Sequence, residues 1–213
     1  MLSLSGLAPM ANDDHQRIIG LTGGIATGKS TVSDYLARRH HLPVLDADIY
    51  AREAVALGSP ILAALHQRYG KDILLEDGCL NRRHLGSIIF NQPDEKLWVE
   101  QQIHPFVRLR FTQVRSEYPL TQTLVYAIPL LFEANLTHLV SEIWVVTCTL
   151  EQQQQRLMER NQLSEAEAQT RINNQHPIGK KVAQADYVLD NSTTKANLYQ
   201  QVDTILAEPA INR

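Results

Sequence analysis

Apolar runs and amphipathic stretches alternate along the chain and predict strands separated by helices. The continuous apolar runs at 17–22, 122–128 and 142–147 leave no polar face, so we expect strands that are buried on both sides. Residues 41–46 predict a further strand, and 186–189 predict a weaker one. Strands that alternate with helices form a mostly parallel sheet with helices on both faces. We therefore expect an α/β fold.

Helical spacing divides the rest of the chain. Val32 and Leu36 lie four residues apart and share the inner face of a helix that follows the first strand. Residues 59–118 keep helical periodicity without a comparable strand, so they predict a helical insertion. Residues 150–180 are polar, helical and rich in arginine, and we expect a helical lid there. The four glutamines 152–155 within it predict a solvated helix face.

The 213 residues suit one core fold that carries insertions. We expect a nucleotide-binding core made of 16–58 and 119–213, with the insertion 59–118 between its halves and the lid 150–180 within it. Residues 1–15 have no periodic apolar pattern and predict a disordered tail, and Met10 is an alternative start to Met1.

Composition excludes several classes of protein. A hydrophobic share of 44% and a charged share of 20% are typical of globular proteins, and a net charge of -3 argues against a nucleic-acid binder. Cys79 and Cys148 lie far apart, which favours free thiols in a reducing cytoplasm. The sequence contains no apolar run near the ~20 residues of a membrane span.

The segment from Gly23 to Ser30 matches the phosphate-binding pattern Gly-x-x-x-x-Gly-Lys-Ser, between a predicted strand and a predicted helix. Backbone N–H groups in such a loop surround phosphate oxygens at the positive end of the helix dipole. Lys29 is expected to contact the β- and γ-phosphates of ATP, and Ser30 to bind Mg²⁺. The alternative is a glycine-rich turn with an incidental lysine. The expected ATP-binding residues are Gly23, Gly24, Ile25, Ala26, Thr27, Gly28, Lys29, Ser30 and Thr31.

Asp46 and Asp48 follow the second predicted strand, at the edge of a parallel sheet where ligands bind. We expect Asp48 to act as the general base and Asp46 to be a metal ligand or a supporting residue. The alternative is a helix cap. The later strands end in Ala127-Ile128-Pro129 and Cys148-Thr149, without the acid that switch GTPases and motor ATPases use. The pattern therefore favours a metabolite kinase.

Cations beyond Lys29 are needed to neutralise a transferring phosphoryl group, and small kinases supply them from a closing lid. Arg156 and Arg160 lie four apart on one helical face of the lid, and Arg160 is the favoured catalytic residue. The alternative is a pair of ordinary solvent-exposed arginines. His104 precedes a proline in an apolar helical stretch, where a packed or substrate-contacting role is expected.

These motifs, in this order, resemble the dephospho-coenzyme A kinases over about 18–191. The matching segments are 20–25 before the phosphate loop, Asp46 to Arg52, Leu80 to Arg82, His104-Pro105, Pro129 to Glu133, Gln155 to Leu157 with Arg160, Arg171-Ile172 with Gln175, and Ala185-Asp186 with Asn191.

The resemblance implies a P-loop kinase fold that uses ATP and Mg²⁺ to phosphorylate the ribose 3′-hydroxyl of dephospho-coenzyme A, the last step of coenzyme A synthesis. It also implies that the helical insertion binds this acceptor, and the matched acceptor-binding residues are Asp48, Arg52, Arg82 and His104. Ala26 and Thr27 depart from the small Gly or Ser usual in the family. The alternatives are a nucleoside or nucleotide kinase, and a non-catalytic nucleotide-binding switch. We expect a monomer, with an oligomer as the alternative.

Overall fold

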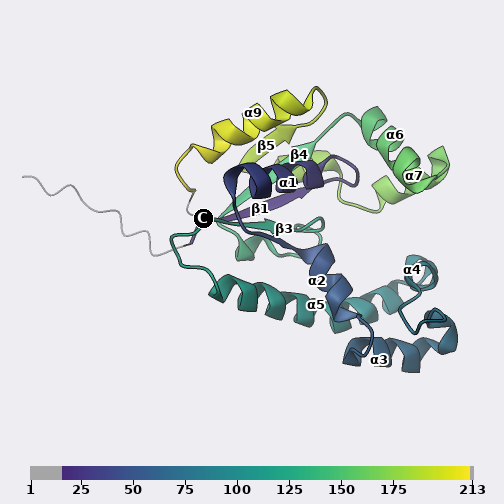
Figure 1. Cartoon of the computed structure of the whole chain (residues 1–213). Helices are drawn as coiled ribbons and strands as arrows, with labels where there is room; N and C mark the ends of the chain where they lie inside the picture. The colour runs from purple at the N-terminus through teal and green to yellow at the C-terminus, as the bar shows by residue number, and fades with distance from the viewer. Residues whose placement is uncertain (1–15, 212–213) are drawn as a thin grey trace, which may run out of the picture.

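Five parallel strands form one sheet within residues 16–211, the part of the chain that the computed structural model describes (Figure 1). The expected tail 1–15 lies outside these residues. The spatial order is β2-β3-β1-β4-β5, so the first strand is central. The strands are β1 (Ile18–Gly23), β2 (Val44–Asp46), β3 (Leu124–Ala127), β4 (Glu142–Thr147) and β5 (Tyr187–Asp190). The expected α/β fold is confirmed.

The beginning of β2 is a correction to the sequence prediction, which placed it at His41. His41 adopts a left-handed conformation with φ 55° and closes helix α1 (Lys29–His40). The carbonyl of Pro43 already accepts a hydrogen bond of 2.9 Å from the amide of Val125, and the strand follows from Val44. The tight end of α1 therefore shortens β2.

Helices cover both faces of the sheet, and successive side chains of each strand point to opposite faces. Ile19 of β1 packs with Val32 and Leu36 of α1 and with helix α9 (Lys195–Leu206). Ile18 packs on the other face, in a core that also contains residues of α2 (Ala47–Ala54), α5 (Pro93–Ser116) and α8 (Ile178–Val182). The central strand is thereby buried between two helical layers.

The segment 59–118 has a small core of its own beside the sheet. Helices α3 (Pro60–Tyr69), α4 (Arg82–Asn91) and the first half of α5 surround it, with the short 3₁₀ turn η1 (Lys71–Ile73). Its buried apolar residues are Val55, Leu62, Leu65, Ile73, Leu80, Leu85 and Val99. The second half of α5 buries Val107 and Phe111 against the sheet instead. One long helix therefore joins the two cores.

The polar region 150–180 contains α6 (Leu150–Asn161) and α7 (Glu165–Asn173), which stand at one end of the sheet (Figure 1), and the beginning of α8. Thr149 and Ser164 cap helices α6 and α7. Each capping side chain accepts a hydrogen bond from the backbone amide three residues later, and the side chain of that later residue accepts one from the backbone amide of the capping residue. A short 3₁₀ turn, η2 (Thr137–Leu139), precedes β4. Among the residues that the structure describes, no helix has the length and apolar character that crossing a membrane requires.

Candidate active site

The phosphate loop joins β1 to α1 and depends on glycine at two points. A side chain at Gly23 would meet the carbonyl oxygen of Val146 at 2.6 Å, so only glycine lets β1 and β4 lie this close. Gly28 has φ 105°, a conformation that favours glycine, and begins α1. Ala26 has φ 61°, a left-handed conformation that costs a residue with a Cβ about 1–2 kcal/mol. The loop therefore adopts this turn at Ala26 although the backbone conformation there is unfavourable in free energy.

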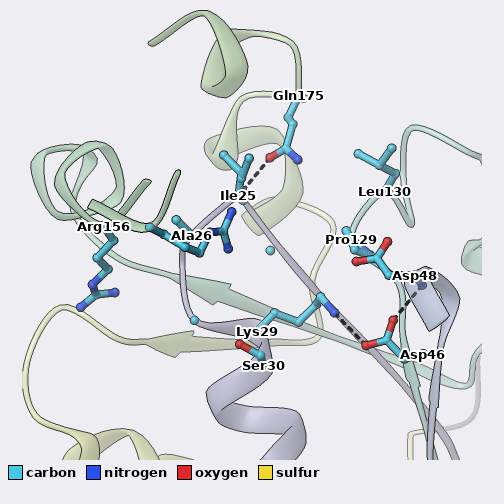
Figure 2. A pocket seen from close by; sticks show the side chains of 14 residues that line it. Ile25, Ala26, Lys29, Ser30, Asp46, Asp48, Pro129, Leu130, Arg156 and Gln175 are labelled. Carbon is cyan, nitrogen blue, oxygen red and sulfur yellow. Dashed lines mark hydrogen bonds and ion pairs between the residues drawn. The ribbon is translucent and has the colours of Figure 1, made fainter. Parts of the chain in front are cut away.

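A cavity of about 530 Å³ lies over the phosphate loop and the carboxyl end of β2 (Figure 2). It brings together most of the residues predicted from the motifs. Its lining residues are Gly23, Gly24, Ile25, Ala26, Gly28, Lys29, Ser30, Asp46, Asp48, Pro129, Leu130, Arg156, Arg160 and Gln175. Five predicted residues do not line it, namely Thr27, Thr31, Arg52, Arg82 and His104. Thr27 is buried, and its hydroxyl donates to the carbonyl of Gly24 at 2.9 Å.

Asp46 uses its two carboxylate oxygens differently. Oδ1 accepts a hydrogen bond of 2.8 Å from the amide of Asp48 and caps α2, while Oδ2 lies 3.7 Å from Nζ of Lys29 (Figure 2). The cap that the sequence offered as an alternative therefore coexists with a position in the cavity. Lys29 and Asp46 are both largely shielded from solvent. The ion pair holds the lysine at the cavity wall until an anion competes for it.

Asp48 has the electrostatic surroundings of a tunable base. Its carboxylate reaches solvent, yet the protein around it partly desolvates the charged form and raises its pKa, and the like charge of Asp46 adds to the rise. Lys29 and Arg52 act in the opposite direction, and the net pKa is raised. A carboxylate with a raised pKa takes up a proton more readily than an ordinary aspartate.

The arginines of α6 enter the cavity from the side of the lid. Arg156 donates from one guanidinium nitrogen to the backbone carbonyl of Asn191 at 3.1 Å, while its other terminal nitrogen is buried without a hydrogen-bond partner among the described residues. Such a nitrogen is costly unless an acceptor is bound. Arg160 is exposed at the rim and donates to the side chain of Asn161 at 2.9 Å. Both arginines remain available to an anionic ligand.

Gln153 corrects the expectation of a solvated glutamine face. This side chain is 6% exposed and donates a hydrogen bond of 2.7 Å to the carbonyl of Ile25 in the phosphate loop. The amide of Ile25 donates in turn to Gln175, just after α7, at 2.7 Å (Figure 2). Helical spacing was the available signal, because Gln153 lies four residues before the buried Leu157. Both ends of the lid region therefore contact the tip of the loop.

Three candidate acceptor residues lie on the helices beside the cavity. Arg52 is in the last turn of α2, which packs against α5, and Arg82 is the first residue of α4. Burial lowers the pKa of Arg82, and the nearby positive charge of Arg52 lowers it further. The two positive charges therefore lie close enough to influence each other. His104 is half-buried on α5, one residue before Pro105.

The donor set of the cavity suits a magnesium ion that is shared with a nucleotide. Across residues 16–211, three His, Cys, Asp or Glu side chains do not converge on one point. Mg²⁺ usually keeps several waters and takes one or two protein oxygens plus substrate phosphates rather than a full protein cage. The Ser30 hydroxyl and the Asp46 carboxylate line the same cavity as the phosphate loop and satisfy that requirement.

The chain is similar to known proteins over most of its length. A family model described as dephospho-CoA kinase matches residues 17–197. The dephospho-CoA kinase of Trichormus variabilis is 60% identical over 191 residues, 90% of this chain and 97% of that protein. The dephospho-CoA kinase of Synechocystis is 56% identical over 187 residues, 88% of this chain and 93% of that protein.

Solved structures show the same architecture. A protein from Thermus thermophilus superposes with a TM-score of 0.79 at 32% identity and covers 91% of this chain and 97% of its own. The dephospho-CoA kinase from Campylobacter jejuni shares the fold, with a TM-score of 0.58 at 22% identity over 90% of this chain and 96% of its own.

Proposed function

The chain belongs to the dephospho-CoA kinase family, and from this we propose that it transfers the γ-phosphoryl group of ATP to dephospho-CoA. The acceptor atom is the ribose 3′-hydroxyl, and the products are CoA and ADP, which makes this the last step of CoA biosynthesis. The observation that carries the proposal is the single cavity that joins the phosphate loop to Asp48. Phosphate-binding groups and a base with a raised pKa face the same space.

ATP binds with its phosphates in the loop between β1 and α1. Backbone amides of the loop and the amino end of α1 supply the positive potential that phosphate oxygens require. Lys29 leaves Asp46 for the β- and γ-phosphates, an exchange that the 3.7 Å separation of the ion pair makes inexpensive. Ser30 and Asp46 hold Mg²⁺, which neutralises charge on the phosphate oxygens.

Asp48 orients the acceptor hydroxyl and takes its proton as the oxygen attacks the γ-phosphorus, while the bond from phosphorus to the bridging oxygen of ADP breaks. The raised pKa brings Asp48 closer to the operating pH, where a general base is most effective. Arg156 and Arg160 approach from α6 and stabilise the charge that spreads over the transferring group. We assign the catalytic role to Arg160 because it is exposed at the cavity, whereas the carbonyl of Asn191 holds one guanidinium nitrogen of Arg156.

Dephospho-CoA approaches from the side of the helical insertion. Arg52 and Arg82 attract its anionic groups, since their mutual repulsion is relieved when an anion lies between them. His104 of α5 is the third residue that binds the acceptor in this proposal. We include a monomeric, cytoplasmic enzyme in the proposal, since free thiols such as Cys79 and Cys148 are typical of a reducing cytoplasm.

The test is a panel of acceptors incubated with ATP and Mg²⁺, with ADP formation and CoA formation both measured. We expect dephospho-CoA to stimulate ADP release, with one CoA formed for each ADP, and AMP, CMP or pantothenate to have little effect. A comparable rate with a mononucleotide would identify a nucleotide kinase instead. Tight binding of ATP with no stimulation by any acceptor would identify a nucleotide-binding switch.

A further inference from the structure

Lys181 of α8 is a charged side chain buried behind the phosphate loop. It is fully shielded from solvent, and its ammonium group has three partners. Oε1 of Glu133 lies at 2.8 Å, the carbonyl of Pro129 at 3.3 Å and the carbonyl of Gly23 at 3.4 Å. Gly23 and Pro129 line the cavity, whereas Lys181 does not. Lys181 therefore bonds to two segments of the cavity wall from the side that faces away from the cavity.

The ion pair is a costly way to stabilise a fold. Removing an ammonium and a carboxylate from water is unfavourable unless both are fully hydrogen-bonded. Burial tends to raise the pKa of Glu133, but hydrogen bonds from Lys181 and from backbone amides outweigh it and lower the pKa. Oε2 of Glu133 is buried without a hydrogen-bond partner among the described residues. An ion pair that leaves one buried carboxylate oxygen without a hydrogen bond is not optimal for stability. This points to a role for the pair beyond stability.

The same carboxylate also holds the end of the lid. Oε1 of Glu133 accepts a hydrogen bond of 3.0 Å from the amide of His176. The preceding residue, Gln175, accepts from the amide of Ile25 at 2.7 Å. The segment that leaves α7 is thus attached at adjacent residues to the phosphate loop and to the ion pair.

We propose that Glu133 and Lys181 form a positioning pair that sets the entrance of the phosphate loop and fixes the segment that follows α7 to it. Gly23 and Gly24 share a planar trans peptide, so holding the Gly23 carbonyl toward Lys181 directs the Gly24 amide to the opposite side. Glu133 transmits any displacement of the lysine to His176. The proposal rests on the proposed function only in placing ATP at this loop.

The experiment compares Lys181→Met, Glu133→Gln, the double variant and a matched control. The control is Arg17→Met, which breaks another buried pair at the opposite end of β1, where the guanidinium lies 2.9 Å from the fully buried Glu142. The melting temperature of each variant is measured first. ATP affinity by calorimetry, and kcat and KM for ATP, are then measured at a temperature at which every variant is folded.

We expect each single variant to lose stability, because it leaves one buried charge or polar group unpaired. The double variant should recover much of the melting temperature, since a neutral pair avoids that penalty. ATP affinity and kcat should nevertheless stay low in all three, with kcat reduced by up to roughly 10²-fold because the loop is displaced. Arg17→Met should lose stability and keep wild-type ATP affinity and kcat.

Wild-type ATP affinity and kcat in the double variant would overturn the proposal, and so would an equal loss of affinity in Arg17→Met. If the double variant does not fold, Glu133→Gln alone decides by the same two measurements. A failure of the proposed function is distinguishable, because the wild-type protein itself would then fail to bind ATP or to convert dephospho-CoA.

Discussion

Asp46 and Asp48 are two residues apart and have different surroundings. Both carboxylate oxygens of Asp46 have partners: one accepts a hydrogen bond from the amide of Asp48, and the other forms an ion pair with Lys29. Asp48 lies in the first turn of α2 with a raised pKa. Asp48 lines the cavity with a raised pKa, whereas Asp46 is bonded to two partners, so the two carboxylates should respond differently when each is made neutral.

Asp48→Asn should lower kcat by roughly 10²–10⁴-fold, the usual effect of losing a general base, with little change in ATP affinity. Asparagine keeps the size of the side chain and one acceptor oxygen but has no charge. The measurement is turnover and ATP affinity across a Mg²⁺ titration. Recovery of the rate at high Mg²⁺ would make Asp48 chiefly a metal ligand, and wild-type turnover at ordinary Mg²⁺ would exclude catalysis by this residue.

Asp46→Asn should move the acid limb of kcat/KM to lower pH. The base works when it is deprotonated, and the like charge of Asp46 raises the pKa of Asp48, so removing that charge lowers the pKa and keeps the base active at lower pH. Asparagine caps a helix as well as aspartate, so α2 should be preserved. The pH profile is recorded at saturating Mg²⁺. An unshifted acid limb would show that another group titrates there.

Helices α6 and α7 contact the rest of the described fold largely through polar side chains. Gln153 and Gln175 bond to the backbone of Ile25, and Arg156 bonds to the backbone of Asn191. Hydrogen bonds of this kind contribute little net stability each, because water competes for the same groups. The region 150–180 is therefore attached to the phosphate loop and to Asn191 by a few identifiable polar contacts.

Arg160→Ala should lower kcat more than it lowers ATP affinity. In the proposed mechanism a cation at the rim reaches the phosphoryl group only when the lid closes, so it would stabilise the transition state more than the ground state. Arg38→Ala is the control, because Arg38 is an exposed arginine on α1 outside the cavity. Rates and ATP affinities of the two variants are compared. Lower affinity at unchanged kcat would make Arg160 a ground-state contact.

Two apolar cores cover the two faces of the sheet, and a third, smaller core lies in the insertion. The sheet and its covering helices carry the phosphate loop, while the small core around Leu65 supports the insertion. Helix α5 is shared, because its first half lies in the small core and Val107 and Phe111 lie against the sheet. We expect the small core to loosen separately from the sheet, with helix α5 as the connection between them.

Leu65→Ala should lower stability by about 2–5 kcal/mol and should act mainly within the insertion. Leu36→Ala is the matched control, since both leucines are fully buried in helices but Leu36 lies in the core under the sheet. Hydrogen exchange should accelerate in α3 and α4 for Leu65→Ala, with ATP affinity kept, and in β1 and β4 for Leu36→Ala. Equal acceleration in β1 and α3 in both variants would show that the two cores unfold together.

Local patterns determined the sheet, its covering helices and the phosphate loop, because each depends on residues close together in the chain. The loop needs only a strand, two glycines, a lysine and a hydroxyl in order, and apolar spacing alone separates strands from helices. Asp46 and Asp48 could be predicted because parallel strands end at one edge. The roles of Asp46, Asp48 and Arg160 remain predictions, and so do the assignments of Arg52, Arg82 and His104 to the acceptor.

Contacts between distant segments were decided only by the tertiary structure. Gln153, Lys181 and Asn191 reach the phosphate loop across sequence separations of 128, 158 and 164 residues. Glutamine, lysine and asparagine side chains usually lie in solvent at the protein surface. For that reason the sequence predicts a solvated face for the glutamines 152–155. A polar side chain is buried where a distant backbone group satisfies it, and the partner is set by how the whole chain closes. Periodicity along one segment does not contain that information.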